Sequence, residues 1–251
     1  MFKGFYNLAS GMLTQSRVLN TVANNIANTS TPGYKKDIMA NSTFRDELVY
    51  RTGNTQKTYT PIGGESMIRT VTELVTDFSQ GHLEETERPL DFCIMGEGFF
   101  RVQMPSGETV YTRNGSFTLD NEGYLSLQHI GRVLGENGPI YLGTDRIHTR
   151  EDGRIVDENG DFLGRLTVVD FADYTQLIKF GEGMFRADGL VELAFPQNTM
   201  ILDRTLEASN MSASDEMVNM MTGQRALQSS AQMLRMYDQL MAKAVSEIGR
   251  V

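Results

Sequence analysis

Apolar residues recur at helical spacing at both ends of this chain of 251 residues, and this pattern constrains the fold more than any other feature. At the N-terminal end the steps alternate between three and four residues, and six of seven positions are apolar: Phe5, Leu8, Met12, Gln15, Leu19, Val22 and Ile26. Such spacing makes one face of an α-helix hydrophobic. Thr31-Pro32-Gly33 then ends the predicted helix, because proline cannot continue the backbone hydrogen-bond ladder.

The C-terminal end repeats this pattern, and eight of its ten positions are apolar: Met217, Met220, Gln224, Leu227, Ala231, Leu234, Asp238, Met241, Val245 and Ile248. Ser212 and Asp215 offer a capping box in front of the predicted helix. Gly223 lies inside it and costs about 1 kcal/mol relative to alanine. We therefore expect packing partners, rather than intrinsic propensity, to stabilise this helix.

Each hydrophobic stripe has to be covered, either by the other stripe or by another chain. Packing of the two helices within one chain is the simpler alternative. Assembly through a coiled-coil-like layer is favoured here, because methionine is frequent in the C-terminal stripe and adapts to imperfect or repeated interfaces. Both alternatives remain open from the pattern alone.

The middle of the chain has a different composition, because residues 51–202 hold 19 of the 24 glycines. Short runs of β-forming residues alternate there with Gly, Asn and Asp turns, at 99–104, 109–113, 116–119, 124–127, 146–149, 154–157 and 163–171. Asn114-Gly115 is the strongest hairpin signal among them. Many short strands with such turns favour an antiparallel β domain.

The predicted fold class is therefore α+β, with paired terminal helices enclosing a mainly antiparallel β middle domain. We predict four segments. These are an N-terminal helix with its following motif at 1–35, an extended linker arm or β segment at 36–85, a β-rich outer domain at 86–202 and a C-terminal helix at 203–251.

Charge is concentrated in the middle of the chain. The net charge of the whole chain is −9, and residues 51–202 contribute −10 through 13 basic and 23 acidic side chains. An acidic body disfavours nucleic acid and anionic membrane surfaces as partners. No apolar run approaches the roughly 20 residues that cross a bilayer, and the first residues lack the apolar core of a secretory signal.

Residue patterns for catalysis or metal binding are absent from the sequence. The single cysteine, Cys93, excludes intrachain disulfides and lies in an apolar stretch, which predicts a buried side chain. His82, His129 and His148 have no metal-ligand spacing. We therefore predict no enzyme, with no catalytic, cofactor or metal residues. One alternative is a hydrolase that uses middle-domain carboxylates such as Asp157 and Asp161 on cell-wall glycan, and another is a monomeric binding module.

Four stretches of this chain resemble bacterial flagellar rod and hook proteins. The most specific is Ala23-Asn24-Asn25-Ile26-Ala27-Asn28-Thr29-Ser30-Thr31-Pro32-Gly33-Tyr34-Lys35, directly after the first helix. The others are Arg88-Pro89-Leu90-Asp91-Phe92 with Gly96-Glu97-Gly98-Phe99-Phe100, Tyr111-Thr112-Arg113-Asn114-Gly115-Ser116-Phe117, and Leu206-Glu207-Ala208-Ser209-Asn210 with Glu216-Met217-Val218-Asn219-Met220. They occur in the family's order and span nearly the whole chain.

This resemblance implies a structural subunit of the flagellar basal body that transmits torque from motor to hook. Family members leave the cell through the flagellar type III export apparatus, without a signal peptide, and then form a helical polymer with themselves and other rod subunits. Their location is the basal body in the cell envelope, in the periplasmic or cell-wall space. Gly131–Ile140 and the compact middle look more like proximal-rod members. Distal-rod members and hook-type proteins are the alternatives, and the loop from Val49 to Met67 departs from both rod patterns.

The resemblance further implies that the terminal helices and the motif after the first helix form the assembly interface. Before assembly we expect Met1–Ile26 and Asp215–Val251 to be poorly ordered. Asparagine amides can cap the helix end or bond a neighbouring subunit, and Tyr34 can anchor against one. The predicted interface residues are Phe5, Leu8, Met12, Leu19, Val22, Asn24, Asn25, Ile26, Asn28, Tyr34, Met217, Met220, Leu227, Leu234, Met241, Val245 and Ile248.

Overall fold

The chain folds into two compact units, each built from segments that are far apart in the sequence. The computed structural model describes residues 2–52, 59–181, 183–193 and 199–248. The first unit, called the helical unit here, contains Met1–Ile26, Asp37–Val75 and Ala213–Val251. The second, called the β domain, contains Ala27–Lys36 and Thr76–Ser212. Each of the segments predicted at 1–35, 36–85 and 203–251 is therefore divided between the two units.

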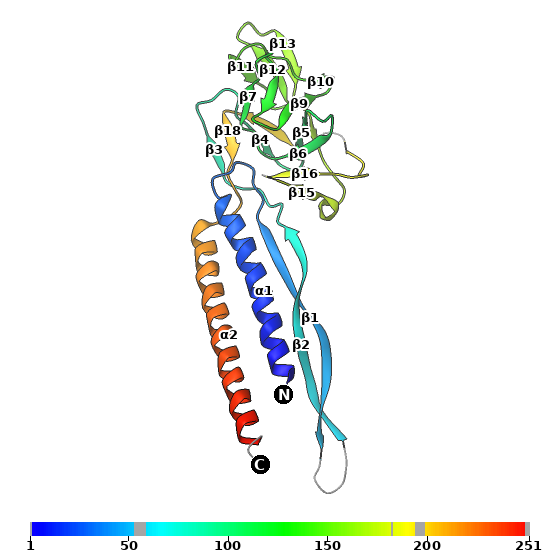
Figure 1. The fold of residues 1–251 in the computed structure, drawn as a ribbon. Helices are drawn as coiled ribbons and strands as arrows, with labels where there is room; N and C mark the ends of the chain where they lie inside the picture. Colours follow the sequence, from blue (N-terminus) through cyan, green and yellow to red (C-terminus); the bar gives the residue numbers. More distant parts are fainter. Residues whose placement is uncertain (1, 53–58, 182, 194–198, 249–251) are drawn as a thin grey trace. The chain divides into compact units, whose positions relative to one another are not determined.

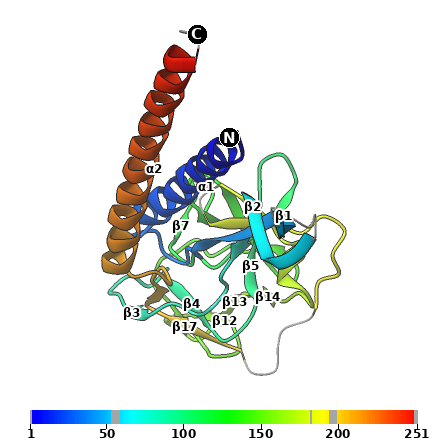
Figure 2. The same ribbon diagram turned by 90° about the horizontal axis from the view of Figure 1, so that it is seen from below.

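The helical unit combines two helices with a long β-ribbon. Helix α1 spans Phe2–Ala27, helix α2 spans Ala213–Ile248, and strands β1 (Asp37–Thr52) and β2 (Tyr59–Thr76) form a two-stranded sheet. Within this unit, α1 lies between α2 and the ribbon (Figures 1 and 2). The stretch expected as a loop from Val49 to Met67 is largely strand, and residues 53–58 lie outside the described part of the chain.

The β domain is a set of short strands whose described pairings are all antiparallel, as the turn spacing predicted. Across the described residues, its largest sheet has the order β15-β16-β6-β5-β9-β8-β7, with β10 beside β9 and β14 beside β5. The strands of this sheet are β5 (Phe99–Gln103), β6 (Thr109–Thr112), β7 (Phe117–Leu119), β8 (Leu125–Leu127), β9 (Gly131–Gly135), β10 (Gly138–Pro139), β14 (Val168–Val169), β15 (Ile178–Phe180) and β16 (Met184–Arg186).

Three smaller sheets complete the described β domain. Strands β11 (Ile147–Thr149), β12 (Arg154–Asp157) and β13 (Phe162–Arg165) form one sheet. Strand β17 (Met200–Asp203) pairs with β4 (Phe92–Met95), and β18 (Thr205–Glu207) pairs with β3 (Leu83–Glu85). A short 3₁₀ turn, η1, spans Tyr174–Gln176. These pairings bring the chain just before α2 back onto strands near the start of the domain.

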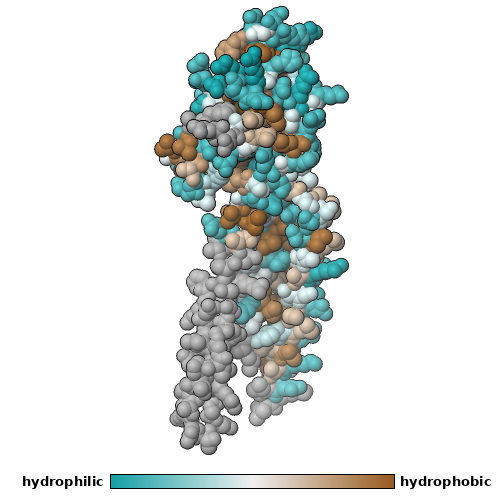
Figure 3. Space-filling model, turned by 180° about the vertical axis from the view of Figure 1, so that it is seen from behind, coloured by the Kyte–Doolittle hydropathy of each residue, from teal (hydrophilic) through white to brown (hydrophobic). Residues whose placement is uncertain are grey.

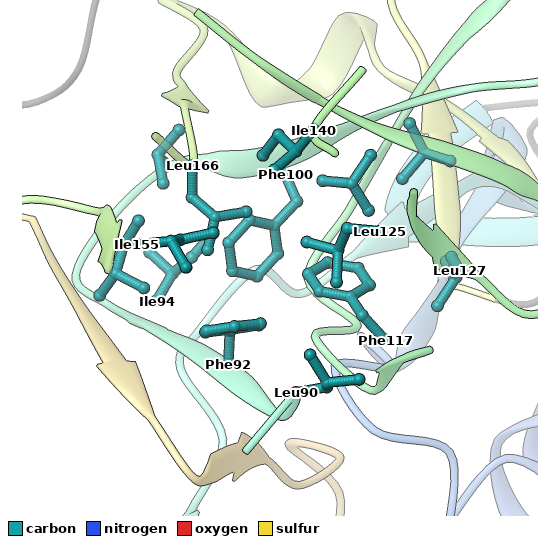
Figure 4. Packing of buried hydrophobic residues seen from close by; sticks show 14 of the residues in the cluster. Leu90, Phe92, Ile94, Phe100, Phe117, Leu125, Leu127, Ile140, Ile155 and Leu166 are labelled. Atoms are coloured by element: carbon teal, nitrogen blue, oxygen red, sulfur yellow. The ribbon is translucent and has the colours of Figure 1, made fainter. Parts of the chain in front are cut away.

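The larger of two buried apolar clusters described in the β domain surrounds Phe100 (Figure 4). The rings of Phe92 and Phe100 both pack on Phe117, with ring centroids 5.9 and 5.3 Å apart, and all three side chains are fully buried. Cys93 is also fully buried, as its apolar neighbours predicted, and burial raises the pKa of its thiol to about 12. The core is therefore closed and holds no reactive thiolate at neutral pH.

The hairpin predicted at Asn114-Gly115 is wrong. Strand β6, before it, pairs with β5 and β16, whereas β7, after it, pairs with β8. The chain instead turns through an Asn114 side chain that accepts a bond from the Ser116 amide, and Gly115 passes directly over β4. The Phe92 amide donates to the Gly115 carbonyl, and a β-carbon on Gly115 would overlap the Phe92 carbonyl oxygen. This glycine is thus required for close approach rather than for a two-residue turn.

We predict that Gly115→Ala destabilises the chain by at least about 3 kcal/mol, because backbone has to move to admit the methyl group. Urea unfolding followed by circular dichroism measures this loss. Gly107→Ala is the control, since open space surrounds Gly107 and only its positive φ resists the change, at about 1–2 kcal/mol. Equal losses for the two variants would contradict the close approach at β4.

Candidate assembly interface

The predicted stripe of α1 is the face that packs inside the helical unit. Its positions are buried or half-buried without exception: Phe5, Leu8, Met12, Gln15, Leu19, Val22 and Ile26. Where Figure 3 colours the helical unit, hydrophobic residues lie between hydrophilic ones. The sequence periodicity therefore located the inner face of α1.

The stripe predicted for α2 is only half right. Met220, Leu227, Ala231, Leu234 and Met241 are half-buried, but Met217 and Val245 are 55% and 69% exposed. Asp238 and Gln224 are exposed as well, and the side chain of Ile248 lies outside the described ones. Buried or half-buried positions also lie one residue before the predicted ones, at Gly223, Ser230, Tyr237 and Ala244.

Two glycines allow this shift of the inner face by one position. A β-carbon on Gly223 would stand 2.8 Å from both Leu19 Cδ2 and Gln15 Nε2 of α1. A second approach joins Gly4 of α1 to the ring of Tyr237 on α2. The residue numbers rise along one helix as they fall along the other, so the pair is antiparallel. Gly223, which costs helix propensity, thereby lets Leu19 pack close to the α2 backbone.

Side chains of the motif after α1 form hydrogen bonds within the chain. Asn25 is buried, and its amide exchanges two hydrogen bonds with the backbone of Asp37, at 2.9 and 3.1 Å. Asn28 accepts bonds from the backbone and hydroxyl of Thr31, which supports the helix-end capping alternative. Asn24 is exposed. The side chains of Asn25 and Asn28 therefore form hydrogen bonds within the subunit.

Tyr34 is 2% exposed, and the ammonium group of Lys179 lies 4.1 Å from the centre of its ring. This is a cation–π contact within the β domain. The side chain of Tyr34 is surrounded by its own chain, so Tyr34 anchors the motif internally. Tyr34 and Asn25 both have their contacts within the chain, and their predicted part in assembly stays a prediction.

A buried ion network, which sequence reasoning missed, joins the motif to the segment before α2. Glu207 accepts a bond from Lys35 Nζ at 2.5 Å and lies 3.4 Å from Arg113 Nη1. Its carboxylate also accepts the Gly81 amide, and Lys35 donates to the Ser79 carbonyl. Burial lowers the pKa of Lys35, and the charge of Glu207 opposes that effect. The network holds the segment after α1 against the segment before α2.

The family-like stretches already contained a signal for this network. Lys35, Arg113 and Glu207 each come from a different one of the four stretches, and Asn210 of the last stretch bonds the Lys36 amide and the Asp77 carbonyl. Arg88 in turn bonds Ser116 and the Phe117 carbonyl. Three-dimensional proximity of the stretches could not be read from their order along the chain.

The His, Cys, Asp and Glu side chains of the described residues are dispersed. Among them, no three His, Cys, Asp or Glu side chains gather as a metal site would require. Asp157 belongs to a tight turn, where its amide donates to the Asp161 carbonyl. No described helix is both long and apolar enough to span a membrane. The arrangement defines a class of protein whose two chain ends form one helical unit and whose middle forms a β domain.

Three family models match this chain in order. "Flagella basal body rod protein" matches residues 5–35, "Flagellar hook protein FlgE/F/G D1 domain" matches 93–136, and "Flagellar basal body rod FlgEFG protein C-terminal" matches 203–247. The first covers α1 and the motif, and the third covers β18 and most of α2. The matched segments therefore include both halves of the buried ion network.

Full-length relatives agree with these matches. The chain is 31% identical to the flagellar basal-body rod protein FlgF of Caulobacter vibrioides over all of both chains. It is 30% identical to FlgG of Bacillus subtilis, over 98% of this chain and 99% of the relative. The chain belongs to the family of flagellar basal-body rod proteins. FlgF and FlgG relatives match at similar identity, so these comparisons do not separate proximal from distal rod.

We predict that Gly223→Leu separates α1 from α2, whereas Gln224→Leu at the next, exposed position does not. The larger side chain at 223 meets Leu19 and Gln15, while position 224 faces outward. Hydrogen exchange of the full chain measures the effect as lost protection in both helices. Equal protection in the two variants, or greater loss with Gln224→Leu, would contradict the assigned inner face.

Glu207→Gln is expected to destabilise the chain by about 3–5 kcal/mol, because it leaves Lys35 and Arg113 buried without a counter-charge. The measurement is the free energy of unfolding in urea at neutral pH. Glu84→Gln on the neighbouring strand β3 is the matched control, since Glu84 is exposed, and we expect a change within about 0.5 kcal/mol. A Glu207→Gln loss as small as that of the control would refute the structural role of the network.

Proposed function

We propose that this protein is a structural axial subunit of the bacterial flagellar rod, which polymerises helically through its terminal helices and carries torque from motor to hook. The observation that supports this most is the packing of both chain ends into one antiparallel pair, in a chain that rod proteins match over its full length. A helix pair at the chain ends is a repeating element that can stack. The β domain is a separate compact unit.

The residues of the predicted stripes have a specific part in this proposal. Phe5, Leu8, Met12, Leu19, Val22 and Ile26 on α1, with Met220, Leu227, Leu234 and Met241 on α2, build the pair within each subunit. Asn24, Met217 and Val245 are exposed in the subunit, and the proposal assigns contacts between subunits to them. Assembly thus uses the outer faces of a pair whose inner face is already filled.

The position, partners and route of export are part of the same proposal. We place the subunit in the proximal rod because Gly131–Ile140 and the compact middle resemble proximal members. Its partners are other copies and other rod subunits, and the flagellar type III export apparatus carries it to the basal body in the cell envelope. The structural role requires no enzyme activity, no cofactor and no metal.

Leu234→Asp tests the proposed function, because a carboxylate on the inner face of α2 opens the pair that assembles. In a strain of the source bacterium that lacks this gene, we expect the variant chain to be absent from isolated basal bodies and motility to be lost. Deletion of residues 1–30 and 213–251 is expected to have the same effect. Gln232→Asp, on the exposed side of the same helix, is the control and is expected to retain motility.

Circular dichroism and limited proteolysis of the purified Leu234→Asp chain check that its β domain is still folded. Normal swimming of that variant, with the chain present in basal bodies, would refute assembly through the helix pair. Normal swimming of the doubly truncated chain would favour a monomeric binding module instead.

A further inference from the structure

Helix α2 carries a second stripe, of uncharged residues, that is exposed in the helical unit. Its residues are uncharged, exposed and spaced alternately by four and three: Thr222, Ala226, Ser229, Met233, Met236 and Leu240. The three largest, Met233, Met236 and Leu240, are 54%, 49% and 66% exposed. This set, called the outer stripe here, lies beside the inner positions Met220, Gly223, Leu227 and Leu234 on the same helix. Spacing of this kind fits another helix, because knobs-into-holes packing repeats every 3.5 residues.

Helix α1 has a matching exposed feature. Tyr6 and Leu13 are 62% and 59% exposed, although the inner stripe of the same helix is covered. They lie seven residues apart, and so do Met233 and Leu240 of the outer stripe, so two helices can pair both sets in one antiparallel register. The α1 sequence Phe2–Ala27 holds basic but no acidic residues, whereas α2 has Asp215, Glu216, Asp238 and Glu247 against three basic side chains. The charges of the two helices are complementary.

The α1 helix of the same chain cannot cover the outer stripe, because it already packs on the inner face of α2 through Leu19 and Gln15. We propose that the exposed face of α1 of a second copy, with Tyr6 and Leu13, packs on the outer stripe of α2. This inference rests on the proposed axial function and adds the surfaces that join neighbouring subunits. The contact continues the interface within the subunit, so that α2 is placed between two α1 helices.

This contact can add one subunit after another, because it does not pair two subunits into a closed dimer. One subunit offers α2 and the other offers α1, which is a heterologous interface, and such interfaces produce rings or open helical polymers. A few half-exposed side chains also bury far less than the roughly 1,200 Å² of a stable isolated complex. Two free copies therefore bind weakly, and the contact is stable when a growing polymer repeats it.

Disulfide cross-linking of the full-length chain tests the contact. The double variant Leu13→Cys, Met233→Cys is produced in the strain lacking the gene, and oxidised basal bodies are analysed on non-reducing gels. We expect a ladder of dimers and larger species, since a bond within one chain would leave a monomer band. Native Cys93 is fully buried and does not compete. Leu13→Cys, Met221→Cys is the matched control, because Met221 is 52% exposed about 120° away around α2, and it is expected to remain monomeric.

A ladder from the Met221 pair but not the Met233 pair would overturn the inference, and so would the absence of a ladder from both pairs in motile cells. If the double-cysteine chains fail to assemble, the incorporation of the single variants Met233→Glu and Met221→Glu into basal bodies tests the contact instead. We expect incorporation to be lost with Met233→Glu and kept with Met221→Glu, and the same result for both would overturn the inference. Absence of the unmodified chain from basal bodies would contradict the proposed function itself, which separates the two failures.

Discussion

The meeting of the segment after α1 and the segment before α2, within the β domain, depends on the buried carboxylate of Glu207. This carboxylate binds Lys35 just after α1 and lies beside Arg113 of the β domain, while its own strand β18 leads to α2. A buried ion pair gives little net stability, but each partner becomes costly when the other is removed. The network therefore selects one way of bringing together the segment that leaves α1 and the segment that enters α2. That selection holds both segments on the same few strands.

In the helical unit, close packing rather than side-chain size determines how the two helices meet. Gly223 lowers the helix propensity of α2 but lets Leu19 approach the α2 backbone. Gly4 likewise lets the ring of Tyr237 approach the backbone of α1. The larger apolar residues of α2, among them Met217, Met233, Met236 and Leu240, are left exposed. A helix that is hydrophobic on more than one side needs more than one partner. A subunit in a polymer meets that need, since each copy has neighbours on several sides.

The stability of the β domain depends on close contacts between backbone segments, and the local sequence does not predict these contacts. Gly115 lies between β6 and β7 of the largest sheet and contacts β4 of another sheet, although its Asn-Gly pair is typical of a simple hairpin. The aromatic core around Phe100 and Phe117 is closed, and its only thiol is protonated at neutral pH. The domain is thus organised for a fixed shape, as transmission of torque requires.

The sequence by itself determined the terminal helices, the antiparallel β middle, the inner face of α1 and the buried state of Cys93, since local spacing and turn chemistry control these features. The four family-like stretches also indicated the family, because their residues and their order are specific to it. Only the tertiary structure decided the inner face of α2, the path through Asn114-Gly115, and the meeting of Lys35, Arg113 and Glu207. These features depend on what lies opposite each residue in space. A periodic pattern shows which positions share a face, but the neighbour that covers that face is decided by packing.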